Sequence, residues 1–257
     1  MGVLATAPLI PVTAETVEKT GFFCKMSARK EAGYRRKLAW LKARFAEGLQ
    51  MRLLGGGERG FIEFMPGDYA WRAIEGAGDY MVIHCLWVVG RSKGKGLSSL
   101  LIEEALATAQ AGGFKGLAAV TSANNWLIDA GILERHGFQS VAKAPPAFDI
   151  MLRRFGPAAA APGFCGGWEQ KLADLPGGGA GFTVFRSDQC PYLDNAVLNV
   201  ARFAEERGIA FREVELTSAE EVRALSPTPY GVFAIVKDGV LLSYHYLSPK
   251  ELAKRVA

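Results

Sequence analysis

A glycine-rich segment with three basic residues, Arg91 to Gly96, is the best candidate for a binding site in this sequence. It follows an apolar stretch typical of a strand and precedes an amphipathic stretch typical of a helix. Glycines let the backbone approach a phosphate closely, and the free N–H groups at the start of a helix attract an anion. Lys93 and Lys95 add positive charge. The segment therefore predicts a site for a phosphate-bearing ligand.

The spacing of this loop resembles the signature of the GNAT N-acetyltransferase superfamily, Arg/Gln-x-x-Gly-x-Gly/Ala, which matches here at Arg91, Gly94 and Gly96. Neither the dinucleotide fingerprint nor the P-loop pattern is matched. The resemblance implies that acetyl-CoA is the co-substrate and that backbone groups near Leu86 and Val88 pair with its pantetheine arm. It also implies that the loop holds the pyrophosphate, through Arg91, Ser92, Lys93, Gly94, Lys95 and Gly96.

A second segment is similar to another part of the same superfamily. Asn124–Trp126 and Leu133–Phe138 resemble its Asn…Tyr-Glu-Lys-x-Gly-Phe region, so the resemblance makes Asn125 a candidate cofactor contact. Leu133 stands where many members carry a tyrosine that protonates the departing CoA thiolate. That general acid is therefore absent or comes from elsewhere.

Direct transfer of acetyl to an amine needs a base that removes a proton from the amine. Glu63 lies among apolar residues of an expected strand, where a carboxyl group would have a raised pKa suited to this role. The alternative is a carboxylate paired with an arginine such as Arg72. His84 lies in the expected strand 80–88, and the usual pKa of histidine suits acid–base chemistry. The alternative is a histidine satisfied within the core. Glu63 and His84 are the two catalytic candidates.

The last third of the chain has a different motif. Cys190-Pro191-Tyr192-Leu193 resembles the glutaredoxin motif Cys-Pro-Tyr-Cys without its second cysteine, and Thr228-Pro229 resembles the site where that family carries a cis proline facing the active cysteine. A thiol at a helix N-terminus has a lowered pKa and is reactive. Cys190 and Pro229 are thus redox candidates. Dithiol exchange within the motif is ruled out, whereas a monothiol reaction with glutathione and a binding role both stay open.

The order of the expected elements predicts an α/β (α+β) fold, a mixed sheet flanked by helices and followed by a small thioredoxin-like α/β domain. Expected helices span 28–47, 96–110 and 126–135, and expected strands span 50–54, 60–65, 70–75, 80–88, 116–121, 139–141 and 150–153. Residues 156–181 are rich in Gly, Ala and Pro, as domain junctions are. We therefore predict a GNAT domain at 1–155, a linker at 156–181 and a thioredoxin-like domain at 182–257. This combination resembles the bacterial YoaP-like acetyltransferases over nearly the whole chain.

Composition narrows the remaining possibilities. The 257 residues are 49% hydrophobic, which can fill a core, and the net charge of +4 comes from basic residues interleaved with acidic ones, so no nucleic-acid partner is expected. The chain has neither a secretory signal nor the roughly 18 uninterrupted apolar residues of a membrane span, so we expect a cytoplasmic protein without a membrane partner. Four dispersed cysteines without a CxxC pair indicate no metal site.

These observations predict an acetyl-CoA-dependent N-acetyltransferase that acts on an amine of a small molecule or peptide. Two alternatives stay open: a redox or glutathione-linked enzyme working through Cys190, and a CoA-binding module that has lost catalysis. The sequence carries no motif for the acceptor amine or the oligomeric state.

Overall fold

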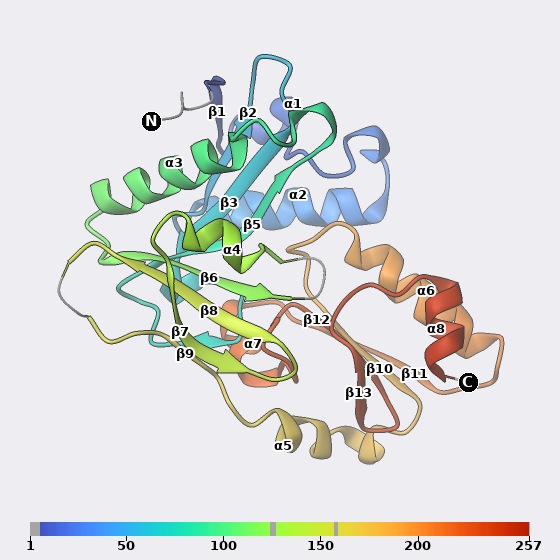
Figure 1. The fold of residues 1–257 in the computed structure, drawn as a ribbon. Coiled ribbons are helices and arrows are strands. Elements are labelled where there is room, and N and C mark those ends of the chain that lie inside the picture. Colours follow the sequence, from blue (N-terminus) through green and yellow to red (C-terminus); the bar gives the residue numbers. More distant parts are fainter. Residues whose placement is uncertain (1–5, 124–126, 157–158, 257) are drawn as a thin grey trace. The chain divides into compact units, whose positions relative to one another are not determined.

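The computed structural model describes residues 6–123, 127–156 and 159–256 (Figure 1). Its contacts divide the chain into two compact units, and each is described by itself. The first contains residues 1–26, 41–70 and 74–164, and the second contains 27–40, 71–73 and 165–257. The first unit thus ends within the glycine-rich junction expected from the sequence. The second also takes two short earlier segments that no sequence signal marked.

The first unit is built on a seven-stranded mixed sheet in the order β1-β2-β3-β5-β6-β8-β7. Neighbouring strands are antiparallel except β5 and β6, which are parallel. The strands are β1 Leu9–Val12, β2 Gln50–Leu54, β3 Gly60–Pro66, β5 Met81–Val88, β6 Gly116–Ser122, β7 Gln139–Ala144 and β8 Phe148–Arg154. The helices are α1 Val17–Thr20, α2 Ala32–Phe45, α3 Leu97–Ala111 and α4 Ala130–Glu134, and β4 Ile74–Glu75 pairs with β9 Gly163–Phe164. Residues of α2 up to Trp40 group with the second unit.

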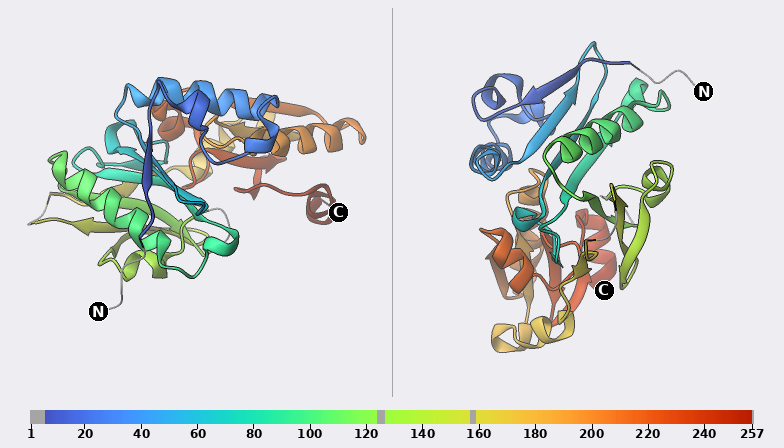
Figure 2. Two further views of the ribbon diagram at one scale, coloured as in Figure 1. Left: turned by 90° about the horizontal axis from the view of Figure 1, so that it is seen from above. Right: turned by 90° about the vertical axis from the view of Figure 1, so that its left-hand side faces the viewer.

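Helix α3 covers one face of this sheet, along β3, β5 and β6 (Figures 1 and 2). Its apolar residues recur at three- and four-residue steps, and Leu101 and Ile102 are fully buried. They pack in one cluster with Ile62 and Phe64 of β3. Because side chains alternate along a strand, Glu63 projects to the sheet face opposite α3.

The two central parallel strands part at the middle of the sheet. β5 pairs with β6 only from Met81 to Ile83, and in the described part of the chain its remainder has no strand on that side. On its other side, Glu63 of β3 pairs with Cys85 and the next residue of β3 pairs with Ile83, so His84 is the extra residue of a β-bulge. Bulges bend a strand and redirect its side chains. The second half of β5 therefore has an open edge.

The second unit has a four-stranded sheet in the order β11-β10-β12-β13, in which β10 and β11 are parallel and the other neighbours are antiparallel. Its elements are α5 Trp168–Ala173, β10 Phe182–Arg186, α6 Leu193–Glu205, β11 Phe211–Glu215, α7 Ala219–Leu225, β12 Phe233–Lys237, β13 Val240–Ser243 and α8 Pro249–Val256. Asp238 and Gly239 both have positive φ, as a type I′ hairpin turn requires.

The fold class, a large mixed sheet flanked by helices with a second smaller sheet, is confirmed, but several predicted limits are wrong. The expected strand 70–75 is reduced to Ile74–Glu75, because Trp71, Arg72 and Ala73 are buried with the second unit. The expected helix 126–135 begins only at Ala130, since Asp129 before it is extended. No helix among the described residues is long and apolar enough to cross a bilayer.

Candidate active site

The loop between β5 and α3 leaves its main-chain donors available. A 3₁₀ turn at Gly90–Ser92 leads into Gly94 and Gly96, which have φ of 75° and 73°, a left-handed conformation that side chains disfavour. The N–H groups from Gly94 to Ser98 have no acceptor among the described residues. Such a run of N–H groups before a helix is an anion site.

Three side chains of the predicted loop hold it to the turn between β2 and β3. The buried Ser92 hydroxyl accepts a main-chain N–H of that turn at 2.8 Å, and Lys95 Nζ lies 2.8 Å from Glu58 Oε1. The hydrogen bond from Lys95, together with one from Ser92, lowers the pKa of Glu58. Arg91 donates to a carbonyl of the same turn at 3.5 Å. Arg91 and Lys95 therefore brace the loop, and the charge that Lys95 brings to it is paired with Glu58.

A cavity of about 590 Å³ lies beside the loop. It is lined by 86–88 of β5, by parts of the loop and first turn of α3 between 92 and 99, and by parts of 127–135. Lys93 and Arg135 line it, and neither has an acidic partner within the described residues. Its size is typical of ligand sites, and these two cations favour an anionic occupant.

The cavity brings together six of the predicted cofactor residues, namely Leu86, Val88, Ser92, Lys93, Gly94 and Gly96. Asn125 lies outside the described residues. Ser99 and Arg135 were not predicted as lining residues. Arg135 falls within the segment that resembled the superfamily and directly follows the end of α4.

The two predicted catalytic candidates, Glu63 and His84, lie next to each other. Glu63 Oε1 is 3.4 Å from His84 Nδ1, and the two side chains are 1% and 0% exposed. The contact depends on the bulge, because the extra residue in β5 is His84 itself. A buried carboxylate beside an imidazole can accept and pass on a proton, so this pair has the composition of a general base.

Leu133 is fully buried in the cluster beneath α3. The position at which the superfamily carries its tyrosine is thus part of the hydrophobic core.

No family model matches this chain. It is similar over nearly its full length to YoaP of Bacillus subtilis (strain 168), an uncharacterized N-acetyltransferase, with 29% identity over 248 residues, which are 95% of this chain and 96% of YoaP. Among solved structures, an acetyltransferase of Thermus thermophilus is 19% identical with a TM-score of 0.42, covering 60% of this chain and 100% of its own. YncA of Salmonella typhimurium, solved with its cofactor acetyl-CoA, is 18% identical with a TM-score of 0.42, covering 61% and 98%. The similarity to YoaP extends over both units.

In the second unit, the motif at Cys190 forms a closed turn. Cys190 is partly buried, and its carbonyl accepts the N–H of Leu193 at 3.2 Å. Helix α6 begins at Leu193, so the thiol precedes the helix by three residues.

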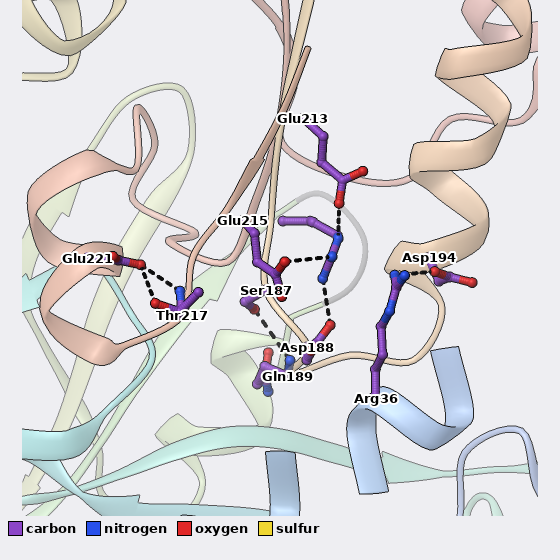
Figure 3. Close-up of polar contacts among 10 residues, drawn as sticks. Arg36, Ser187, Asp188, Gln189, Asp194, Glu213, Glu215, Thr217 and Glu221 are labelled. Carbon is purple, nitrogen blue, oxygen red and sulfur yellow. Dashed lines mark hydrogen bonds and ion pairs between the residues drawn. The ribbon is translucent and has the colours of Figure 1, made fainter. Parts of the chain in front are cut away.

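A charged network lies at the end of β10, just before this turn (Figure 3). Arg186, whose side chain is 5% exposed, contacts Asp188 at 2.6 Å and Glu215 at 3.1 Å and also pairs with Glu213. Burial disfavours the charged guanidinium, but the Glu213 hydrogen bond and the three carboxylates outweigh it, so the pKa of Arg186 is raised. Burial raises the pKa of Asp188, and Arg186 offsets only part of that effect.

The cis proline expected at Pro229 is wrong. Among the described residues the cis peptide bond is Pro145–Pro146, so Thr228–Pro229 is trans. The hydroxyl of Ser226 donates to the carbonyl of Thr228 at 3.1 Å and accepts its N–H at 3.4 Å. This short turn holds the segment before Pro229.

Proposed function

We propose that this protein is an acetyl-CoA-dependent N-acetyltransferase of the GNAT type, which transfers acetyl directly to an amine of a small molecule or peptide. The observation that carries the proposal is the cavity at which a loop of free N–H groups, two cations and the open edge of β5 meet. The near full-length similarity to YoaP, which bears the name of an N-acetyltransferase, supports it.

The residues around the cavity fit the chemical groups of CoA. The N–H groups from Gly94 to Ser98 would bind the pyrophosphate, with Lys93 and Arg135 as further phosphate partners. The open edge of β5 near Leu86 and Val88 would pair with the amide groups of the pantetheine arm, as an added strand does. Acetyl-CoA supplies the activated acetyl thioester.

The Glu63–His84 pair would take the proton that the amine loses. As the nitrogen forms its bond to the acetyl carbon, the C–S bond breaks and CoA leaves as a thiolate, which water can protonate. Because His84 touches Glu63, the proton can be shared between carboxylate and imidazole until it returns to solvent.

Binding of acetyl-CoA tests the proposal directly. Acetyl-CoA should raise the melting temperature of the wild type, because a ligand that binds only the native state stabilises it. Gly94→Val should abolish the shift, because it adds a branched side chain at a residue with φ of 75° that lines the cavity.

Gly113→Val is the matched control. Gly113 has φ of 76° and, like Gly94, no atom within 4 Å of an added Cβ, but it lies after α3 and does not line the cavity. It should keep the full shift. A folded Gly94→Val protein with an undiminished shift would show that the cofactor site is wrongly placed.

A further inference from the structure

Ser99, His136 and Glu103 form a hydrogen-bonded chain that ends at the cavity. Ser99 lies in the first turn of α3 and lines the cavity. Its hydroxyl is 3.0 Å from His136 Nε2, and His136 Nδ1 is 2.6 Å from Oε1 of Glu103, one turn further along α3. The His136 side chain is 10% exposed and that of Glu103 is 54% exposed. The chain thus runs from the cavity to the surface.

The protonation state of His136 decides what the Ser99 hydroxyl can offer to a ligand. The carboxylate of Glu103 fixes a proton on Nδ1, since a carboxylate only accepts hydrogen bonds. If Nε2 carries no proton, it accepts the Ser99 hydroxyl hydrogen, and only oxygen lone pairs are left for the ligand. If Nε2 is protonated, it donates to Ser99, and the hydroxyl hydrogen becomes free for an anion.

We propose that Ser99 donates its hydroxyl to a phosphate group of the ligand in this cavity, and that His136, held by Glu103, takes up a proton when the phosphate binds. Ser99 is the binding residue, and His136 and Glu103 are positioning residues that act through it. This inference rests on the proposed function for the nature of the ligand. The phosphate is either the pyrophosphate or the 3′-phosphate of CoA.

The charged groups around His136 affect whether its imidazole takes up a proton when the phosphate binds. Glu103 on α3 is the acidic side chain that contacts the imidazole. Two cations lie near it: Arg153 of β8 donates to the main-chain oxygen of His136, and Arg135 precedes it in the chain. A bound phosphate adds negative charge on the cavity side, so it shifts the balance toward the protonated form.

A double-mutant cycle measured by calorimetry with CoA tests the assignment. Ser99→Ala and His136→Ala should each raise Kd about tenfold, as the loss of one hydrogen bond to a charged group does. The double variant should lose about the same tenfold, because His136 acts only through Ser99. Glu103→Gln should weaken binding, whereas Glu104→Gln, the adjacent acid that contacts Arg52 and Thr108, should not. Losses that multiply to about a hundredfold, or no loss at Ser99, would overturn the inference.

Proton uptake separates this role from simple packing. Titrations at one pH in buffers of different ionisation enthalpy should show that the wild type takes up a fraction of a proton more than His136→Gln does. Glutamine supplies a fixed N–H donor near Nε2, so this variant should bind more tightly than His136→Ala. Equal uptake in wild type and His136→Gln would contradict the proposal.

Binding of dephospho-CoA, which lacks the 3′-phosphate, shows which phosphate group of CoA Ser99 contacts. If Ser99→Ala weakens dephospho-CoA as it weakens CoA, Ser99 binds the pyrophosphate; if it weakens only CoA, Ser99 binds the 3′-phosphate. A wild type that binds neither would refute the proposed function itself. A wild type that binds both, with Ser99→Ala unchanged toward each, would refute this inference alone.

Discussion

The two units each contain a strand that passes through a turn into a helix, and the two junctions differ in what they leave unbonded. After β5, the N–H groups of five successive residues from Gly94 have no acceptor among the described residues, and a cavity lies beside them. After β10, the turn at Cys190 is closed by its own main-chain hydrogen bond. The same order of elements therefore leaves a cavity beside unbonded N–H groups in one unit and a hydrogen-bonded turn in the other.

Charge differs between the junctions in the same way. Lys93 and Arg135 line the first together with the single acid Asp129, and neither cation forms an ion pair in the described part of the chain, so they can attract an anion. Arg186 at the second is surrounded by three carboxylates. These carboxylates neutralise the charge of Arg186, so it attracts an anionic ligand only weakly. Basic residues are thus evidence of a site only when their partners are known.

The largest expected effect is on turnover in the first unit. Glu63→Gln should lower kcat by on the order of a hundredfold, because the amide cannot accept the proton from the amine, while acetyl-CoA affinity stays unchanged. His84→Gln tests the other half of the pair in the same assay. Glu75→Gln, an exposed carboxylate on β4, is the control. If neither Glu63→Gln nor His84→Gln lowers kcat, another group is the base. The Glu63–His84 pair would then no longer distinguish the first unit from the second.

Local patterns were enough to predict the loop, the strand before it and the helix after it. The loop was predictable because its glycines and its flanking periodicities lie within a few consecutive residues. The contact between Glu63 and His84 was not, since it depends on a bulge that adds one residue to β5. The residue types indicated Glu63 and His84 as separate catalytic candidates. Their contact follows only from the register of β3 against β5.

A smaller effect concerns the thiols. The sequence predicts Cys190 as the most readily alkylated cysteine, because only this one precedes a helix with a proline at its start. The sequence also predicts that Cys85 is buried in its strand, but all four cysteines are partly exposed, so that prediction is wrong. Limiting iodoacetamide near neutral pH, followed by mass-spectrometric mapping, should label Cys190 first, about tenfold ahead of Cys24 and Cys85.

Cys165 is the sharpest competitor to Cys190. Burial lowers the pKa of Lys171, and the nearby Cys165 offsets part of that effect, so the two groups interact electrostatically. Lys171→Gln should slow the labelling of Cys165 and leave that of Cys190 unchanged. Labelling of Cys165 before Cys190 would mean that a neighbouring cation matters more than the turn before α6.

In the second unit, the sequence did not predict the ion pairs of Arg186 or the interaction of Lys171 with Cys165. The partners of Arg186 come from β11 and from the turn after β10, positions that are distant or offset in sequence but adjacent once β10 and β11 pair in parallel. The trans peptide bond before Pro229 was not predicted either. The Thr-Pro pattern matched, but the bond is trans.

The smallest expected effects are on the pH dependence of stability, and they have opposite signs in the two units. In the first, hydrogen bonds from Lys95 and Ser92 lower the pKa of Glu58 below its ordinary 4.5, so its contribution is present above that value and is lost as the pH falls through the folded-state pKa. In the second, burial raises the pKa of Asp188 above 3.8, so its contribution is present below that value and is lost as the pH rises through the folded-state pKa. Urea unfolding from pH 3 to pH 7 should therefore show the advantage of wild type over Glu58→Gln growing with pH, and that over Asp188→Asn shrinking. If both differences changed in the same direction, the contrast between Glu58, whose pKa hydrogen bonds lower, and Asp188, whose pKa burial raises, would be refuted.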